Sequence, residues 1–182
     1  MNFGGGMSDK TQIKIFILFL LDELRYPLDD STISRIVQEN GYVGMFDFQE
    51  CFSQLQELGH VSEYEQGGVK YYTISETGHI VASELQDEIM ESIREKSAKS
   101  AARLLSLHKR DARVECTVKE VDGRFCVTST VTERGRETYR VEITVNGAVE
   151  AERMKKHFLD KPDDVCRGLL AVMSGEVDYL LS

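Results

Sequence analysis

The stretch from Met45 to Ile74 limits the choice of fold more than any other part of the chain. Its first half, MFDFQECFSQLQELG, places apolar residues at helical spacing. The side of this helix that we expect to be buried carries Phe48, Cys51, Phe52, Leu55 and Leu58. The second half, VSEYEQGGVKYYTI, predicts two short strands around Gly67 and Gly68. The stretch therefore predicts a helix that leads directly into a two-stranded hairpin.

Two more helices are expected before this stretch. Residues 11–25, TQIKIFILFLLDELR, are apolar on nearly every side, which exceeds the arc of about 100° that a surface helix needs. We expect the surplus to pack on a second partner, either the C-terminal half of the chain or another subunit. Pro27 ends the first helix, and Asp29 is expected to cap the second one. The buried side of that second helix holds Ile33, Ile36 and Val37.

A long helix is predicted after the hairpin. The segment SETG, from Ser75, is a capping signal, and no strong breaker follows it for about thirty residues. The apolar stripe of this run changes face near Ile89 and Met90. We therefore expect its first half to pack on the preceding helices and its second half to pack elsewhere.

From Arg113 the apolar residues recur at every second position, which is the period of a strand. The segments VECTVKEV, RFCVTSTV and ETYRVEITV each alternate apolar residues with threonine and charge. The pattern predicts a three-stranded antiparallel meander with one apolar face and one wet face. Two helices, around EAERMKKHF and from Pro162 onward, are expected to cover the apolar face, and VDYLL is expected to form a last strand or a tail.

The two turns of the meander can be predicted from register. Asp122-Gly123 is a two-residue hairpin signal, which pairs Val118 with Val127. For the second turn, a three-residue loop at residues 133–135 pairs Val127 with Val141, whereas a two-residue loop pairs it with Glu142. The longer loop is therefore favoured.

The sequence thus predicts an α+β protein with an N-terminal winged helix-turn-helix, because three helices followed by a hairpin are typical of that domain. The expected parts, in order, are a flexible N-terminus (1–9), a winged-helix domain (10–89), a connecting and dimerising part of the long helix (90–112), and a small α+β domain (113–182).

Several phrases resemble an uncharacterised bacterial winged-helix family, classed as a domain of unknown function. They are KIFILFLLDELRYPLDDSTIS, the Phe46–Leu58 helix, YYTISETG, EAERMKKHF and PDDVCRGLL, and they cover nearly the whole chain. The resemblance implies a winged-helix fold related to PadR-like and MarR-like transcription factors, with a small α+β domain behind it. It implies no biochemical role.

Composition and motifs argue against several functional classes. The longest apolar run, Ile15 to Leu21, is far shorter than the roughly 20 residues that span a bilayer, and MNFGGG lacks the basic flank of a signal peptide. We therefore expect a cytoplasmic protein without membrane contact. The four cysteines show no C-x-x-C spacing and are expected to be buried thiols rather than a zinc or redox site. No enzyme, cofactor or metal site is predicted.

The leading functional hypothesis is a transcriptional regulator that binds DNA as a homodimer. In winged domains the second helix of the motif enters the major groove and the wing reaches a neighbouring phosphate. The candidate DNA-binding residues are Gln49, Ser53, Gln54 and Gln56 on that helix, and Lys70 and Tyr71 on the wing.

The charge of this region opposes the DNA hypothesis. Met45–Ile74 carries one basic residue against five acidic ones, a net charge of −4, whereas DNA affinity comes mainly from cations. A basic stripe lies elsewhere, at Lys96, Lys99, Arg103 and Arg110. It is either a solvated helix face or a surface for an acidic partner protein, a second subunit or nucleic acid. The alternative function is a winged-helix module that contacts proteins and not DNA.

Overall fold

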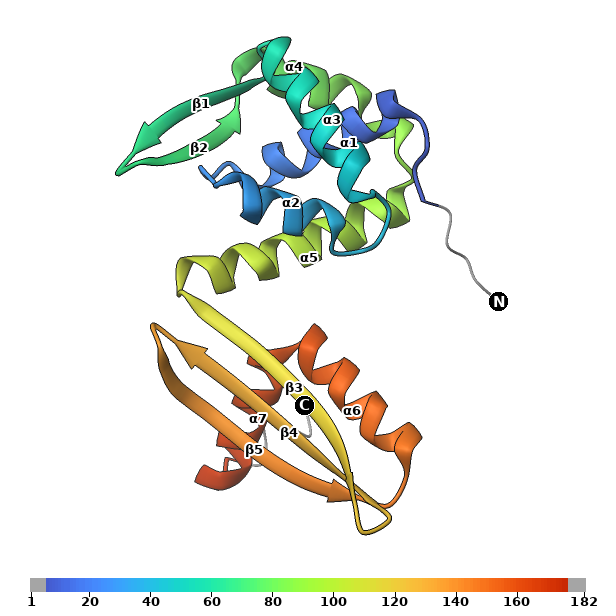
Figure 1. Cartoon of the computed structure of the whole chain (residues 1–182), viewed down its shortest axis with the longest axis vertical. Coiled ribbons are helices and arrows are strands. Elements are labelled where there is room, and N and C mark those ends of the chain that lie inside the picture. Colours follow the sequence, from blue (N-terminus) through green and yellow to red (C-terminus); the bar gives the residue numbers. More distant parts are fainter. Residues whose placement is uncertain (1–5, 177–182) are drawn as a thin grey trace. The chain divides into compact units, whose positions relative to one another are not determined.

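The computed structural model describes residues 6–176, which form seven α-helices and two antiparallel sheets (Figure 1). The chain divides into an N-terminal unit, Met1–His108, and a C-terminal unit, Lys109–Ser182. The expected class of a mixed α+β protein is confirmed. The predicted last strand or tail at VDYLL lies outside the described residues.

The N-terminal unit contains five helices, a single 3-10 turn and one hairpin. Their bounds are α1 (Lys10–Leu24), α2 (Asp30–Gln38), α3 (Met45–Glu57), β1 (Val61–Gln66), β2 (Val69–Ile74), α4 (Glu76–Leu85), η1 (Gln86–Glu88) and α5 (Glu91–Lys109). The predicted caps are confirmed, since the Asp29 carboxylate accepts from the Thr32 amide at 3.0 Å and the Ser75 hydroxyl accepts from the Gly78 amide at 3.1 Å.

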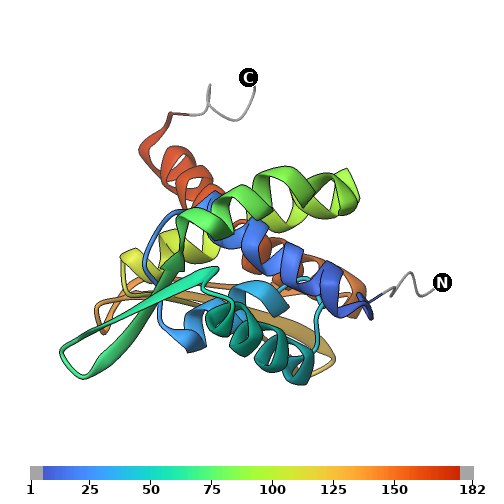
Figure 2. The same ribbon diagram turned by 90° about the horizontal axis from the view of Figure 1, so that it is seen from above.

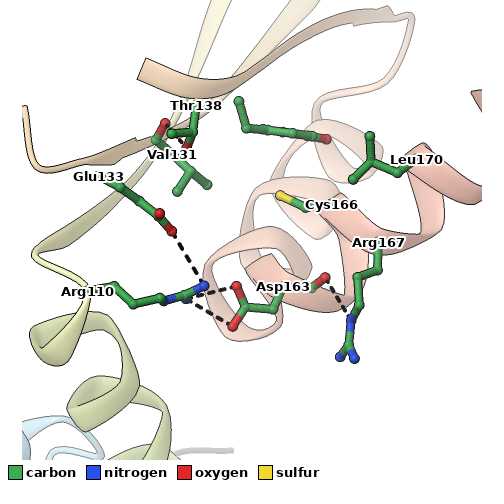
Figure 3. A pocket seen from close by; sticks show the side chains of 9 residues that line it. Arg110, Val131, Glu133, Thr138, Asp163, Cys166, Arg167 and Leu170 are labelled. Carbon is green, nitrogen blue, oxygen red and sulfur yellow. Dashed lines mark hydrogen bonds and ion pairs between the residues drawn. The ribbon is translucent and has the colours of Figure 1, made fainter. Parts of the chain in front are cut away.

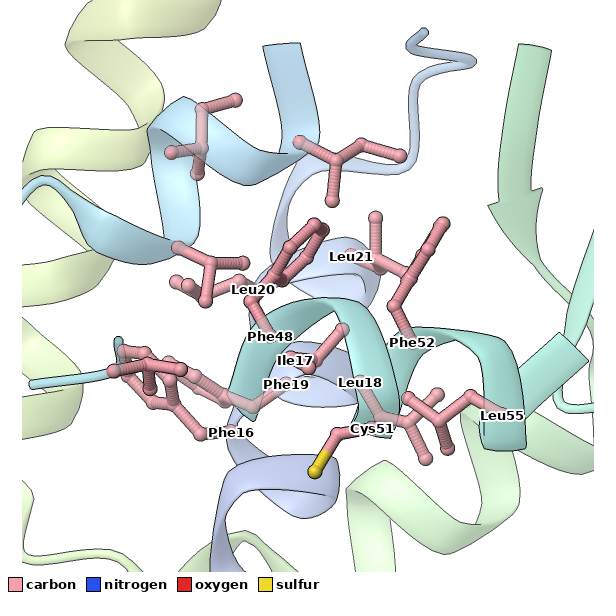
Figure 4. Packing of buried hydrophobic residues seen from close by; sticks show 14 of the residues in the cluster. Phe16, Ile17, Leu18, Phe19, Leu20, Leu21, Phe48, Cys51, Phe52 and Leu55 are labelled. Atoms are coloured by element: carbon pink, nitrogen blue, oxygen red, sulfur yellow. The ribbon is translucent and has the colours of Figure 1, made fainter. Parts of the chain in front are cut away.

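The core of the N-terminal unit is built around α1. Its buried residues are Ile13 and Ile15 to Leu21, and they pack against Phe48, Cys51, Phe52 and Leu55 of α3 (Figure 4). Leu58 was expected on the same buried side, and this prediction is wrong. Its side chain is 60% exposed, because it caps the end of α3 where the chain turns away at Gly59, whose φ is +72°.

The surplus apolar surface of α1 is covered inside the N-terminal unit. The helix contacts α3, α4, η1 and β2, and each of its residues from Ile15 to Leu21 is buried. The prediction that this surface packs on the C-terminal half or on another subunit is therefore wrong. The reason is that α4 and η1, which follow the wing, also pack on α1.

The predicted long helix after Ser75 is two helices. The chain leaves the helical conformation at Ile89, with φ −96° and ψ +131°, and α5 starts at Glu91. Ile89 is 3% exposed and belongs to the same core as Ala101 and Leu104 of α5. The expectation that the second half packs elsewhere is also wrong. The stripe changes face because the chain breaks there and both helices pack on one core.

The C-terminal unit is a three-stranded sheet with two helices. Its elements are β3 (Ala112–Val121), β4 (Arg124–Glu133), β5 (Arg136–Val145), α6 (Ala148–Asp160) and α7 (Pro162–Ser174), and the strand order is β3-β4-β5. The core of this unit holds Cys116, Val127, Val131, Ala151 and Phe158. The predicted meander is confirmed, and α6 packs on its apolar face with α7 beside α6 (Figure 1).

The first turn of the meander is as predicted, and the second is not. Asp122 and Gly123 both have positive φ, and Val118 pairs with Val127. At the second turn Arg134 and Gly135 form a two-residue loop, also with positive φ at both positions, so the predicted three-residue loop is wrong.

A β-bulge explains the error in the second turn. The register shifts between Val131 and Thr132, where β5 carries one extra residue, so that Val127 pairs with Ile143. A bulge adds a residue to one strand, and it restores apolar pairing after a short loop. Loop length alone, in strands without a bulge, does not predict the pairing of Val127 with Ile143.

Candidate functional site

The exposed side of α3 is polar. Gln49 and Ser53 are exposed, and Gln54 and Gln56 are half-buried. This face is exposed because the opposite side of the helix, at Phe48, Phe52 and Leu55, packs into the core. The β1–β2 hairpin extends away from the helices of the same unit, as both views show (Figures 1 and 2).

Two lysines of α1 reach the polar face of α3. The Lys10 ammonium forms an ion pair with the Glu50 carboxylate, and the hydrogen bond from Lys10 to Glu50 raises the pKa of the lysine. The Lys14 Nζ donates to the Oε1 of Gln54 at 3.2 Å. These two cations change the local net charge from −4 to −2.

Sequence reasoning missed Lys10 and Lys14 because it counted charge only from Met45 to Ile74. A signal for them exists, since they stand four positions apart just before the wholly apolar run from Ile15 to Leu21. Residues at that spacing share one face of a helix. These two lysines lie on the side of α1 that faces the polar residues Glu50 and Gln54 of α3.

The hairpin residues proposed from sequence both have partners. The Lys70 Nζ lies 3.0 Å from the Glu63 Oε1, and this hydrogen bond raises the pKa of Lys70. The Tyr71 ring stacks on Tyr64, with centroids 5.7 Å apart and an angle of 24° between the ring planes. The hairpin therefore presents a neutralised lysine and an aromatic pair in which Tyr64 is exposed and Tyr71 is half-buried.

The predicted basic stripe is not continuous. The Lys96 Nζ lies 5.5 Å from the centre of the Tyr42 ring. Arg103 forms an ion pair with Glu39, the C-cap residue of α2. Lys99 is exposed. Arg110 lies beyond the end of α5, so the prediction that it shares a helix face with the other three is wrong. The acids that neutralise the stripe come from other segments, which the sequence count did not include.

Apolar side chains lie exposed at both ends of α3. Met45 and Phe46 begin the helix, and Phe46 is 85% exposed. Leu58 follows the last residue of the helix. An exposed phenylalanine next to an exposed methionine is typical of a surface that contacts another molecule.

The cysteines differ in burial. Cys51 and Cys116 are buried as predicted, whereas Cys126 and Cys166 are half-buried, so the prediction that all four are buried is wrong. Burial raises the pKa of the Cys51 thiol, whose sulfur donates to the Lys10 carbonyl at 3.7 Å. Across residues 6–176, no three His, Cys, Asp or Glu side chains are placed to hold a metal ion together. No helix in the same range is long and apolar enough to cross a membrane.

Comparisons with known proteins give a family and no activity. No curated protein and no solved structure matches the chain significantly. One family does match, over residues 13–173, which is most of both units. The chain therefore belongs to the family described as a domain of unknown function, DUF4364.

Proposed function

We propose that the N-terminal unit is a winged helix-turn-helix domain of a transcriptional regulator, related to the PadR-like and MarR-like factors. In this proposal α2 and α3 are the helix-turn-helix, α3 is the recognition helix, and the β1–β2 hairpin is the wing. One observation carries the proposal: α3 turns a polar face with Gln49 and Ser53 outward, and Lys10 and Lys14 flank that face. Glutamine reads adenine in the major groove, and lysine neutralises phosphate.

The ion pair between Lys10 and Glu50 does not prevent contact with phosphate. Both side chains are about half exposed, and ion pairs in contact with solvent contribute little to stability. A DNA phosphate can therefore replace the carboxylate at small cost. The N-terminal unit as a whole has a net charge of −8, so we expect weak affinity for random DNA.

The test is binding of the full chain to a labelled random duplex, measured by fluorescence anisotropy from about 50 mM salt upward. We expect the double variant Lys10→Gln/Lys14→Gln to lose affinity and to lower the slope of log affinity against log salt by about two. The matched control is Lys96→Gln/Lys99→Gln, which removes the same charge from α5 and should leave the slope unchanged. The proposal fails if the wild-type chain does not bind at the lowest salt.

We propose that the regulator acts as a homodimer, because helix-turn-helix proteins read two half-sites about one helical turn of DNA apart. The N-terminal core is complete within one chain, so the dimer contact is expected to use exposed surface instead. Sedimentation equilibrium gives the oligomeric state directly. A monomer at micromolar concentration would contradict this part of the proposal.

The second candidate is a module that contacts proteins and does not bind DNA. Phe46, Met45 and Leu58 favour it, because exposed apolar residues beside the acids Glu50 and Glu57 suit a partner with basic and apolar groups. An acidic partner on α5 is less favoured, since Glu39 already neutralises Arg103. Failure to bind DNA, together with loss of a pulled-down partner in Phe46→Ser, would favour this function.

A further inference from the structure

A pocket of about 490 Å³ opens in the C-terminal unit between the sheet and α7 (Figure 3). Val131 and Tyr139 line its sheet side, and Cys166 and Leu170 line its helix side. Its volume lies in the range of about 300–1,000 Å³ that small-molecule sites occupy. All its lining residues lie between Arg110 and Leu170, within one unit.

The pocket lies where the β4–β5 bulge interrupts the sheet. Thr138 is the extra residue of β5, and its hydroxyl donates to the Val131 carbonyl at 3.2 Å. Bulges bend a strand and re-aim its side chains, and they are common next to binding sites. The bulge therefore shapes the sheet wall of the pocket.

Arg110 lies at one end of the pocket, between two acids (Figure 3). Its Nη2 donates to both carboxylate oxygens of Asp163, at 2.9 and 3.1 Å, and its Nη1 lies 3.4 Å from the Glu133 Oε1. Its Nε is buried and has no hydrogen-bond partner in the part of the chain that the structure describes. A buried donor without an acceptor is costly, so Arg110 is only partly satisfied by its two acidic neighbours.

A second pocket, of about 550 Å³, adjoins the first and shares Arg110, Glu133 and Thr138 with it. Its remaining lining residues are Lys109, Arg134 and Arg136. The linings of the two pockets together hold four cations besides Arg167, which pairs with Asp164 at 2.6 Å, against the two acids Glu133 and Asp163. The whole C-terminal unit has a net charge of −1, so positive charge is concentrated at these pockets.

We infer that the joined pockets bind a small amphipathic anion. Its phosphate or carboxylate group lies among Arg110, Arg134 and Arg136, whose positive charges attract oxyanions. Its apolar body lies between Tyr139 and Leu170. Leu170 is 64% exposed, and a bound apolar group would cover it.

The chemistry of the pocket suits reversible binding. Burial raises the pKa of the Cys166 thiol, so the sulfur is protonated near neutral pH and is a poor nucleophile. Burial also raises the pKa of Tyr139, which keeps its phenol neutral and able to donate a hydrogen bond. The Tyr139 ring is held in place by stacking on Phe158, with centroids 5.9 Å apart.

The test uses anilinonaphthalene sulfonate, a fluorescent aromatic anion, titrated into the full chain. We expect saturable binding that weakens by about tenfold in Leu170→Glu, which places a negative charge at the mouth of the pocket. Arg136→Ala should weaken it by about threefold. The matched controls are Met173→Glu, on an exposed position of the same helix, and Arg153→Ala, on α6, neither of which lines either of these two pockets.

Competition then identifies the head group. Octanoate and octyl phosphate share an apolar body, and the one that displaces the dye at the lower concentration carries the preferred oxyanion. Loss of binding in both pocket variants, with both controls unchanged, supports the inference. Absence of saturable binding, equal loss in the controls, or displacement by neither competitor would overturn it. All substituted side chains are exposed, so the unfolding temperature of each variant should match the wild type.

Discussion

Lys14 on α1 donates a hydrogen bond to Gln54 on α3 at 3.2 Å, although 40 positions separate them in the chain. The contact places a cation beside a glutamine on the exposed face of α3. Together with the ion pair of Lys10 and Glu50, it means that α1 contributes to this face as well as to the core.

Reversing the acids of α3 should raise affinity for random DNA if this face contacts phosphate. In Glu50→Lys/Glu57→Lys both substituted positions are exposed, and each replaces a repelled charge with an attracted one. We expect a gain of about tenfold or more at about 50 mM salt, measured by fluorescence anisotropy. The control is Glu84→Lys/Glu88→Lys, the same charge change on α4 and η1. An equal gain in both would mean that net charge alone is acting, and no gain in the first would place the contact surface elsewhere.

Ile89 should be a main support of the N-terminal core. It is buried at the break between α4 and α5, whereas Met90 beside it is 69% exposed. We expect Ile89→Ala to lower the free energy of unfolding by about 2–4 kcal/mol, and Met90→Ala to change it by less than about 0.5 kcal/mol. Urea unfolding followed by circular dichroism measures both. Similar small effects in the two variants would show that the break does not depend on burial of Ile89.

Gly78 should not tolerate a side chain. A Cβ atom there would lie 2.1 Å from the His60 carbonyl oxygen and 2.9 Å from the Ile74 Cγ1. The first of these atoms is backbone and cannot move away cheaply, so Gly78→Ala is expected to cost about 3 kcal/mol or more. The matched control is Gly44→Ala, whose Cβ would meet only the mobile Asp47 carboxylate at 3.4 Å. Thermal unfolding should separate the two by several degrees.

The cap at Asp29 should give a stability difference that depends on pH. Burial acts to raise the pKa of this carboxyl, but hydrogen bonds from Ser31 and Thr32 outweigh it, and the pKa is lowered. A lowered pKa in the folded state means that the stabilisation is present above the unfolded value, 3.8, and is lost as the pH falls through the folded value.

We therefore expect Asp29→Ala to cost about 1 kcal/mol at pH 7 and less at pH values below about 3. Asp30→Ala removes an exposed neighbouring carboxylate from the first turn of α2 and should cost only about 0.3 kcal/mol. Urea unfolding at both pH values tests this. A cost for Asp29→Ala that stays constant with pH would contradict the role of its charge.

Local sequence signals predicted most of the elements. Caps at Asp29 and Ser75, the turn at Gly67-Gly68 and the strand period after Arg113 depend on neighbouring residues, and all of them are present in the structure. The break at Ile89 was missed because no glycine or proline marks it. It depends on burial against distant helices, which can override the helical propensity of a segment.

The candidate site was predicted only in part for the same reason. Gln49 and Ser53 could be found from the period of α3 alone. Lys10 and Lys14 reach that helix only after folding, and so does Glu39, which neutralises Arg103. Charges that come together from separate segments cannot be summed within one window of sequence. The pocket beside Tyr139 depends on a bulge that adds one residue to β5. No local sequence pattern in β5 predicts this bulge.

The base of the β1–β2 hairpin is tied to the chain after α1. Leu28 and Tyr72 exchange two backbone hydrogen bonds, of 3.1 and 2.8 Å, whereas residues 62–70 are all exposed. The amide hydrogens of the tip should therefore exchange with deuterated solvent well before that of Tyr72, which hydrogen-exchange mass spectrometry can resolve. The hairpin is thus anchored at its inner end, and we expect any adjustment to a bound surface to occur in its outer half, beyond the Leu28–Tyr72 bridge.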